Sequence, residues 1–496
     1  MEEGMEGHRP LWEELMKKQV FNPYLPSYEY VPDGEPYVFG DRLYVYGSHD
    51  KFNGKNFCLG DYVCWSAPVS DLGEWKYEGV IYRKTQDPKN KKGLSVLNAP
   101  DVQKGPDGRY YLYYVASMLT VVSVAVSDHP EGPFAFYGYV GHRDGTPYGK
   151  KHGEAYNFDP AVFMDEDGRI YLYSGFAPDR GFLRTVMGMR GNLDGAYGME
   201  LEQDMLTLKG EPVMVAPGPL LVSGTGFEGH AFYEASSMRK VRGKYYFVYS
   251  SELSHELCYA TGDAPLGPFR YGGTLISIGD IGLDGNQNAM NYLGNTHGGM
   301  AEINGQWYIF YHRQTNRQKC CRQGCAEKIT ILPDGSIPQA ELTSCGLNNG
   351  PLLGRGTYEA RIACHLMSRK GTFKYEKSFE KDKDGIHPFF TQSGGDRDEN
   401  GDQYIANMTD GSVAGFKYFR FEGASRIQIM TRGNGKGKVE LRTGPEGSVI
   451  GRIEVAPSAE WQLSSVIGVA LPEEVSPLYF TYVGEGYMNF NQFELL

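Results

Sequence analysis

Acidic residues stand ahead of aromatic hairpins at several places in this chain of 496 residues. In the stretch LNAPDVQKGPDGRYYLYYV, Asp101 is followed by a turn at Asp107-Gly108 and then by a strand rich in tyrosine. Carboxylates that crowd into an enclosed site cannot all ionise at their free pKa values, because desolvation and like charge raise some of them. A cluster of this kind can hold a protonated acid beside an ionised base.

The hairpin belongs to a repeat. Five segments share apolar residues, a tight turn and an aromatic strand, and their equivalent tyrosines follow one another every 60 to 75 residues: Tyr44, Tyr111, Tyr171, Tyr246 and Tyr308. Each unit has room for a four-stranded antiparallel sheet, so the repeat predicts a five-bladed β-propeller. An irregular β-sandwich with chance hairpins is the alternative.

A polar residue precedes each equivalent tyrosine by ten to twelve positions. These residues are Asp33, Asp101, Asp159, Glu234 and, in the fifth unit, the pair Thr296-His297. The first strand of each propeller blade lines the central channel, so we expect the five units to deliver four acids and one histidine to one mouth of the channel. Glycoside hydrolysis uses such a pair of carboxyl groups.

The composition narrows the class of protein. The 36 tyrosines and 65 glycines favour an all-β fold, and tyrosine also suits sugar binding. A net charge of -12 without a basic block argues against nucleic acid or a membrane surface as partner. The charged N-terminus lacks an apolar signal segment and the eight cysteines are scattered, so we expect a cytoplasmic protein.

Five stretches together resemble glycoside hydrolase family 43, and they are FNPYLPSYEYVPDGEPYVFGDRLYVYGSHD, APDVQKGPDGRYYLYYV, FDPAVFMDEDGRIYLYSG, FYEASSMRKVRGKYYFVYSS and NTHGGMAEINGQWYIFYHR. The resemblance implies five-bladed propellers that act on glycans containing arabinose, xylose or galactose by inversion. It implies that Asp33 is the general base, that Asp101 tunes and orients the acid, and that Glu234 is the general acid.

The resemblance also implies substrate contacts by Asp159, His297 and Arg322, and a channel calcium beside His297. Each residue has a structural alternative: a turn acid for Asp33 and Asp159, a salt bridge to Arg239 for Glu234, and a buried, satisfied side chain for His297. Asp33 is followed by glycine where family members usually have proline, and Glu35 and Asp41 lie close by as rival bases.

The propeller pattern stops after Leu347. We predict an N-terminal extension at residues 1–20, the propeller at 21–347, a linker at 348–361, and a β-sandwich of the jelly-roll type at 362–496, which resembles family 6 carbohydrate-binding modules. Trp461, Tyr404 and Tyr487 are candidate sugar platforms there, or else core and interface residues.

The expected activity is that of an inverting glycosidase, of the α-L-arabinofuranosidase or β-xylosidase type, on oligosaccharides or polysaccharides. A galactan-directed β-galactosidase, a propeller glycoside phosphorylase and a non-catalytic sugar-binding protein are the alternatives. Three phased acids count against the last two, because a phosphorylase needs one carboxylic acid and a binding protein needs none.

Overall fold

A computed structural model describes residues 20–496 except 118, 180, 182–183, 186–190, 373–381 and 383. Apart from Val20, the expected N-terminal extension lies outside this range. Strands dominate, and the short 3-10 turns are η1 (Lys84–Gln86), η2 (Leu283–Gly285) and η3 (Ala360–Ile362). Within these ranges, no helix has the length and apolar character needed to cross a bilayer.

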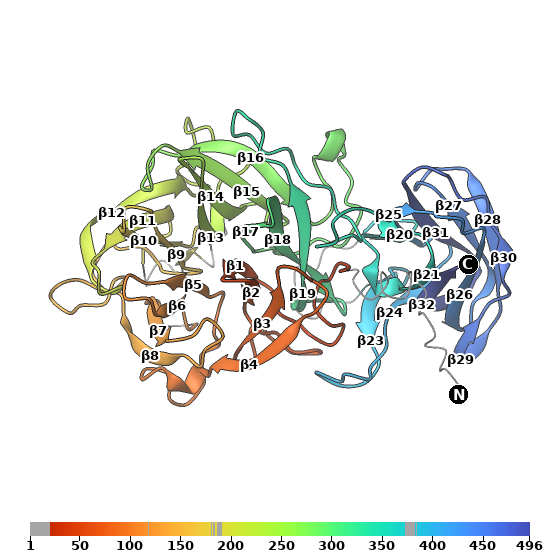
Figure 1. Cartoon of the computed structure of the whole chain (residues 1–496), viewed down its shortest axis with the longest axis horizontal. Coiled ribbons are helices and arrows are strands. Elements are labelled where there is room, and N and C mark those ends of the chain that lie inside the picture. Colours follow the sequence, from red (N-terminus) through yellow and green to blue (C-terminus); the bar gives the residue numbers. More distant parts are fainter. Residues whose placement is uncertain are drawn as a thin grey trace, which may run out of the picture.

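The predicted five-bladed propeller is confirmed (Figure 1). Its sheets follow one another in chain order. Blade I holds β1 (Glu35–Phe39), β2 (Arg42–Tyr46), β3 (Tyr62–Pro68) and β4 (Lys76–Tyr82). Blade II holds β5 (Asp101–Lys104), β6 (Tyr110–Tyr114), β7 (Ser123–Ser127) and β8 (Ala135–Tyr139). Blade III holds β9 (Ala161–Met164), β10 (Ile170–Gly175), β11 (Gly195–Leu201) and β12 (Leu208–Pro217).

Blade IV holds β13 (Phe232–Val241), β14 (Lys244–Ser251), β15 (Glu256–Gly262) and β16 (Arg270–Ser277). Blade V differs from the predicted four-stranded unit, since its described sheet has only β17 (Met300–Ile303), β18 (Gln306–Thr315) and β19 (Gln318–Ile329). After β19 the chain leaves this sheet and runs beside blade IV, where Ala340 bridges to Ile276. The segment that could have added a fourth strand therefore covers the neighbouring blade.

The repeat explains how the blades pack. All five equivalent tyrosines lie in the second strand of their blade and are buried, in β2, β6, β10, β14 and β18. Side chains of adjacent blades share apolar clusters, as Tyr111 and Tyr113 do with Val162 and Leu172. Gly108 ends the β5–β6 turn with a φ of 86°, a conformation that residues with a Cβ rarely adopt.

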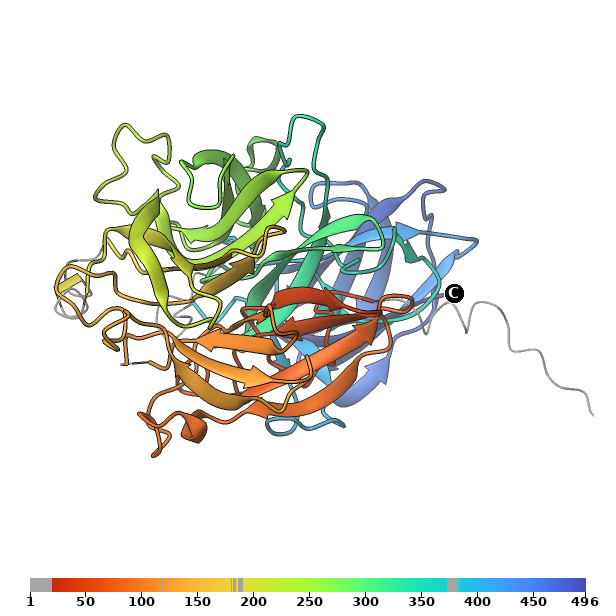
Figure 2. The same ribbon diagram turned by 60° about the vertical axis from the view of Figure 1, so that its left-hand side comes forward.

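The C-terminal β-sandwich is also confirmed, and Figure 2 shows it beside the propeller. One sheet contains β20 (Leu352–Leu353), β22 (His365–Met367), β25 (Val413–Arg420), β27 (Lys436–Arg442), β28 (Val449–Val455) and β31 (Ser476–Glu485). The other contains β21 (Gly356–Glu359), β23 (Phe389–Gln392), β24 (Gln403–Thr409), β26 (Arg426–Gly433), β29 (Ser458–Leu463), β30 (Ile467–Gly468) and β32 (Tyr487–Leu495).

The stretch expected to be a linker is instead part of the sandwich. Within 348–361, β20 pairs with β25 of one sheet and β21 pairs with β32 of the other. Tyr358 is buried among Phe419 and Phe493 in the core between the sheets. Leu352 and Tyr358, which stand among the Gly and Asn residues of this segment, are buried in the core of the sandwich. The other predicted domain boundaries stay predictions.

A buried ionic network joins the two domains. The ammonium of Lys417, in β25, lies 3.2 Å from Asp280 and 2.7 Å from Glu341, both on the propeller side. His365 of β22 contacts the same Asp280 oxygen at 2.7 Å, and Tyr479 of β31 contacts the other ring nitrogen of His365 at 2.9 Å. Buried charges must be paired, so this network fixes the sandwich against the propeller.

Lys417→Met should destabilise the protein by about 3–5 kcal/mol, because it removes the ammonium that pairs with the buried Asp280. Urea denaturation followed by tryptophan fluorescence measures this change. Lys370→Met is the control, since Lys370 and its partner Asp384 are exposed and such pairs contribute about 0–1 kcal/mol. Equal effects of the two substitutions would contradict the role of the network.

Candidate active site

Asp33 is held by a buried arginine. It precedes β1 in the left-handed region, with a φ of 58°. Arg322 of β19 contacts its carboxylate at 2.8 Å, and His312 of β18 lies 3.2 Å from the same oxygen. Burial alone raises the pKa of Asp33, but Arg322 and His312 outweigh burial and hold that pKa well below its usual range. Asp33 is therefore ionised at neutral pH.

Arg322 also joins blade I to blade V. Its Nε and Nη2 donate to the two carboxylate oxygens of Asp50 at 2.8 and 3.1 Å, while its Nη1 reaches Asp33. The guanidinium lies over the ring of Phe57, 4.8 Å from its centroid. We expected Arg322 to contact substrate. The structure places it beside Asp33, the predicted general base, and its three guanidinium nitrogens all donate to Asp33 or Asp50.

Glu234 lies in β13, where the register with β14 shifts on both sides of it. Ala235 has a φ of 70°, so the strand bulges at the position that presents this side chain. Glu234 keeps some solvent-facing surface, but the surrounding protein displaces most of its water. Burial, together with the negative charge of Asp159, raises the pKa of Glu234 to about 8. It is therefore mostly protonated at neutral pH.

Asp159 forms an ion pair with His297. Its Oδ2 lies 3.4 Å from Nδ1 of the imidazole, and both side chains are buried. Burial raises the pKa of Asp159, with His297 opposing the rise. Burial lowers the pKa of His297, but Asp159 outweighs this and raises it to about 9. At neutral pH His297 is therefore protonated and paired with Asp159, and this pair lies beside Glu234.

The strand registers sort the channel residues into two layers. Tyr37 pairs with Tyr44, Gln103 with Tyr111, Phe163 with Tyr171 and Ala301 with Tyr308. Counting back from these pairs gives a first layer made up of Asp33, Ala99, Asp159 and His297, with Glu234 of the bulged strand beside them. A second layer, two residues further along each strand, contains Glu35, Asp101, Ala161, Ser237 and Gly299.

Contacts within the second layer support this division. Ser237 donates to Oε2 of Glu35 at 3.2 Å, and a Cβ placed on Gly299 would lie 2.4 Å from that same oxygen. Arg239 contacts Glu35 at 2.9 Å and lies over the ring of Tyr37. The salt bridge that was the alternative role for Glu234 is therefore made by Glu35, which pairs with Arg239. Because Glu35 is held in this pair, it is no longer a rival to Asp33 as the base.

Asp101 does not have the surroundings expected of a residue that tunes Glu234. Its carboxylate accepts hydrogen bonds from the Tyr37 hydroxyl at 2.6 Å and from the amides of Val102 and Val162 at 2.8 and 2.7 Å. Burial and Glu35 raise its pKa to about 7. The charge that raises the pKa of Glu234 most is that of Asp159. The structure places Asp101 in the second layer, and Asp159 takes the place beside Glu234.

Two residues near Asp33 escaped the sequence analysis. Asp50 and His312 follow the equivalent tyrosines Tyr44 and Tyr308 by six and four positions. Both numbers are even, so the two-residue alternation of the second strand of each blade could have indicated them. Asp41 was a rival base, but it is exposed in the turn between β1 and β2.

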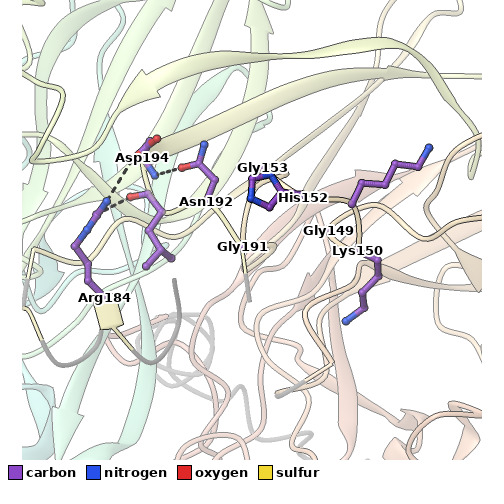
Figure 3. A pocket seen from close by; sticks show the side chains of 10 residues that line it. Gly149, Lys150, His152, Gly153, Arg184, Gly191, Asn192 and Asp194 are labelled. Carbon is purple, nitrogen blue, oxygen red and sulfur yellow. Dashed lines mark hydrogen bonds and ion pairs between the residues drawn. The ribbon is translucent and has the colours of Figure 1, made fainter. Parts of the chain in front are cut away.

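Aromatic side chains flank the acids. Phe158 and Tyr233 immediately precede Asp159 and Glu234, and both pack against a cluster of Tyr156, Phe176 and Leu193. Leu193 also borders a cavity of about 600 Å³ between residues 149–153 and 191–194 (Figure 3). Arg184 in this cavity is engaged by Asp194, and none of the acids of the first layer lines it.

Two of the three candidate sugar platforms of the sandwich, Tyr404 and Trp461, pack on one another. Arg432 lies over the rings of both Trp461 and Tyr404, and the indole nitrogen donates to Asp402 at 3.2 Å. The ring faces that Arg432 covers cannot stack on a sugar at the same time. Tyr487 is 39% exposed.

The sequence profile of Glycosyl hydrolases family 43 matches residues 29–337, more than half of the chain. The chain belongs to glycoside hydrolase family 43. It is 51% identical over 488 residues to a xylosidase/arabinosidase of Thermoclostridium stercorarium, covering 97% of this chain and 99% of the relative. It is 32% identical over 313 residues to a xylosidase/arabinosidase of Bacteroides ovatus, covering 58% of this chain and 87% of the relative.

Solved structures share the fold of this family 43 chain. A β-xylosidase/α-arabinofuranosidase from a compost microbial metagenome, in complex with xylotriose and described as a calcium-free form, is 28% identical, with a TM-score of 0.50 over 65% of this chain and 98% of that one. An arabinoxylan arabinofuranohydrolase from Bacillus subtilis, in complex with cellotetraose, is 21% identical, with a TM-score of 0.52 over 96% and 97%.

A loop of the sandwich supports the segment that carries Asp50. Asp396 accepts a hydrogen bond from the amide of Phe52 at 2.8 Å, and Gln392 accepts one from Tyr30 at 2.6 Å. The carbonyl of Tyr30 in turn accepts from the amide of Asp50. The contacts therefore run from the sandwich to Asp50, and from there through Arg322 to Asp33.

Asp159→Asn should lower the pKa of Glu234, because it removes the negative charge that raises that pKa most. Carboxyl ¹³C NMR titration measures this pKa, with Glu234→Gln identifying the signal. Asp101→Asn is the matched control, since its carboxylate lies in the second layer. If Asp101→Asn lowers the pKa of Glu234 as much as Asp159→Asn, the assignment of layers is wrong.

Asp396→Ala should lower kcat/KM for a nitrophenyl glycoside several-fold, because the unsupported amide of Phe52 loosens the segment that carries Asp50. Asp396→Asn should restore most of the loss, since an amide oxygen still accepts this hydrogen bond. The exposed Glu399 of the same loop, changed to alanine, should leave kcat/KM unchanged. A loss in Asp396→Asn equal to that in Asp396→Ala would contradict the support.

Proposed function

We propose that this family 43 chain is an inverting glycosidase that removes arabinofuranosyl or xylosyl units from oligosaccharides. One observation carries the proposal: the channel holds a carboxylate that stays ionised, Asp33, together with a carboxyl group that stays protonated, Glu234. Glycoside hydrolysis needs this division between base and acid. The similarity to the xylosidase/arabinosidase of Thermoclostridium stercorarium supports the choice of sugars.

In the proposed mechanism, Asp33 takes a proton from a water molecule, and the oxygen of that water attacks the anomeric carbon. Glu234 gives its proton to the glycosidic oxygen as the bond to the leaving sugar breaks. Asp159 keeps Glu234 protonated through its negative charge, with His297 as the counter-ion that limits the effect. Arg322 keeps Asp33 ionised and fixes its orientation.

The division between acid and base also bears on the alternatives. A phosphorylase would use phosphate as nucleophile, so it has no need of a carboxylate held ionised by a buried arginine. A binding protein has no need of a glutamate kept protonated. A galactan-directed β-galactosidase would use the same acid and base and differs only in the sugar. A panel of nitrophenyl arabinosides, xylosides and galactosides, with and without phosphate, separates these possibilities.

Glu234→Gln and Asp33→Asn should each lower kcat by about 10²–10⁴-fold, because each removes a proton-transfer group. The wild-type rate should fall as pH rises through about 8, since Glu234 must be protonated to act. On the acid side the rate should persist well below neutral pH, since Asp33 stays ionised there. Proton NMR of the first-formed sugar should show the inverted anomer, and a retained anomer would make Asp33 a nucleophile instead.

We propose further that a calcium ion binds beside His297. Oε1 of Glu35 and Nε2 of His297 lie 4.0 Å apart, both are buried, and neither has a hydrogen-bond partner among the described residues. Once His297 has released the proton that it shares with Asp159, one carboxylate oxygen and one imidazole nitrogen could hold calcium if water supplied the remaining ligands, since calcium takes six to eight, chiefly oxygens. When bound, the ion would supply positive charge and fix the orientation of these side chains.

Removal of calcium by chelation should lower the melting temperature of the wild-type protein, and added calcium should restore it. Differential scanning calorimetry measures the shift. In Glu35→Gln the response to calcium should be weakened, because the substitution removes the charged ligand. A melting temperature that does not respond to chelation would remove calcium from this proposal.

We also propose that the enzyme works in the cytoplasm on imported oligosaccharides. All eight cysteines are free thiols, as a reducing compartment favours.

A further inference from the structure

A second group of polar side chains lies within blade IV. His230 precedes β13, and Glu256 and Cys258 point from β15 to the same place. Nδ1 of His230 lies 2.7 Å from Oε1 of Glu256, Sγ of Cys258 lies 3.3 Å from that oxygen, and Sγ and Nδ1 are 3.9 Å apart. The proposed mechanism uses none of these three residues.

We propose that His230, Glu256 and Cys258 bind a divalent cation of the zinc class. A triangle with these three sides has a point about 2 Å from each of its corners, which is close to the bond lengths that zinc forms with nitrogen, oxygen and sulfur. At that point the ion lies in the plane of the three donor atoms, so the side chains must shift to give tetrahedral angles, and water would then take the fourth position.

The surrounding residues hold the three ligands in place. Ser251 and Thr274 donate to the two oxygens of Glu256 at 2.6 and 3.0 Å, and the ring of Tyr271 stacks on His230 with a centroid distance of 4.8 Å. Outer partners of this kind fix the orientation of metal ligands and strengthen metal binding. The Glu256 and Cys258 side chains are buried and that of His230 is 32% exposed, so an ion would enter from the histidine side.

The choice of metal follows from the donor atoms. A thiolate and an imidazole favour zinc and its softer neighbours, whereas calcium and magnesium prefer oxygen ligands. Binding releases the proton of the Cys258 thiol and the proton that His230 shares with Glu256. The site therefore differs in chemistry from the proposed calcium position in the channel, where no thiol takes part.

An ion at this position would stiffen the entry to β13. The backbone carbonyl of His230 accepts a hydrogen bond from the Tyr249 hydroxyl at 2.8 Å, and β13 begins two residues later and carries Glu234. A metal bond from His230 to β15 would tie this entry to the third strand of the blade. We therefore expect the ion to stabilise the folded protein.

Cobalt titration of the metal-free full-length protein tests the proposal without any activity assay. Co²⁺ should produce the near-ultraviolet charge-transfer band of a cobalt–thiolate bond, and Zn²⁺, but not Ca²⁺, should abolish it. Cys258→Ser should lose the band, and His230→Gln should weaken cobalt binding at least tenfold. Cys345→Ser is the matched control, since this partly exposed thiol lies elsewhere, and it should keep the band.

Two results would overturn the proposal: no thiolate band in the wild-type protein, or an unchanged band in Cys258→Ser. Near-ultraviolet circular dichroism shows whether each variant is folded. If Cys258→Ser does not fold, His230→Gln decides, because its side chain is partly exposed and unchanged cobalt affinity in that variant would equally reject the site. A rise in melting temperature with Zn²⁺ in the wild type that is absent from His230→Gln supports it.

Discussion

The buried charge of Arg322 is the constraint on which the channel depends. A guanidinium removed from water must be paired, and here it is paired twice, by Asp33 and by Asp50. Both acids belong to the first blade and the arginine belongs to the last. The same ion pairs therefore join the two ends of the ring and hold Asp33 as a carboxylate. Closure of the propeller and ionisation of the proposed base have one physical cause.

Environment, rather than residue type, sets the behaviour of the other acids. Among the described residues, no arginine or lysine forms an ion pair with Glu234, so burial and the neighbouring Asp159 outweigh His297 and keep it protonated. Asp101 is also held partly protonated, but by Glu35 and by its own burial, at a different depth in the channel. The protonation of each of these acids thus depends on which charge it faces.

The sandwich takes part in this arrangement from outside the ring. Its buried lysine, Lys417, fixes the domain to the propeller, and its loop at Asp396 contacts Phe52 in the segment that carries Asp50. Arg432 covers faces of Tyr404 and Trp461, two of the three aromatic residues that were candidate sugar platforms. The described contacts therefore connect the sandwich to Asp33, the proposed base. The ring faces of Tyr404 and Trp461 that Arg432 covers are not free to stack on a sugar.

The sequence by itself determined the five hairpins, their buried tyrosines and the acids that precede them, because strand periodicity and Asp-Gly turns are local properties that reappear in each blade. It also placed Asp33, Asp159, Glu234 and His297 at the channel. Only the tertiary structure decided which acid stands beside Glu234. A window of ten to twelve residues before each tyrosine spans two residues, as much as the step between the two layers, which is about 6–7 Å along a strand, so the window cannot assign an acid to one layer.

Asp101 therefore resembled Asp33 in sequence although the strand register makes it equivalent to Glu35. The pairing of Arg322 with Asp50, and the place of residues 348–361 in the sandwich, likewise depended on contacts between segments far apart in the chain. The pattern of one strand fixes which face of that strand is buried. Which residues then meet across a channel depends on how far each strand is shifted relative to the others, and only the packed blades determine that shift.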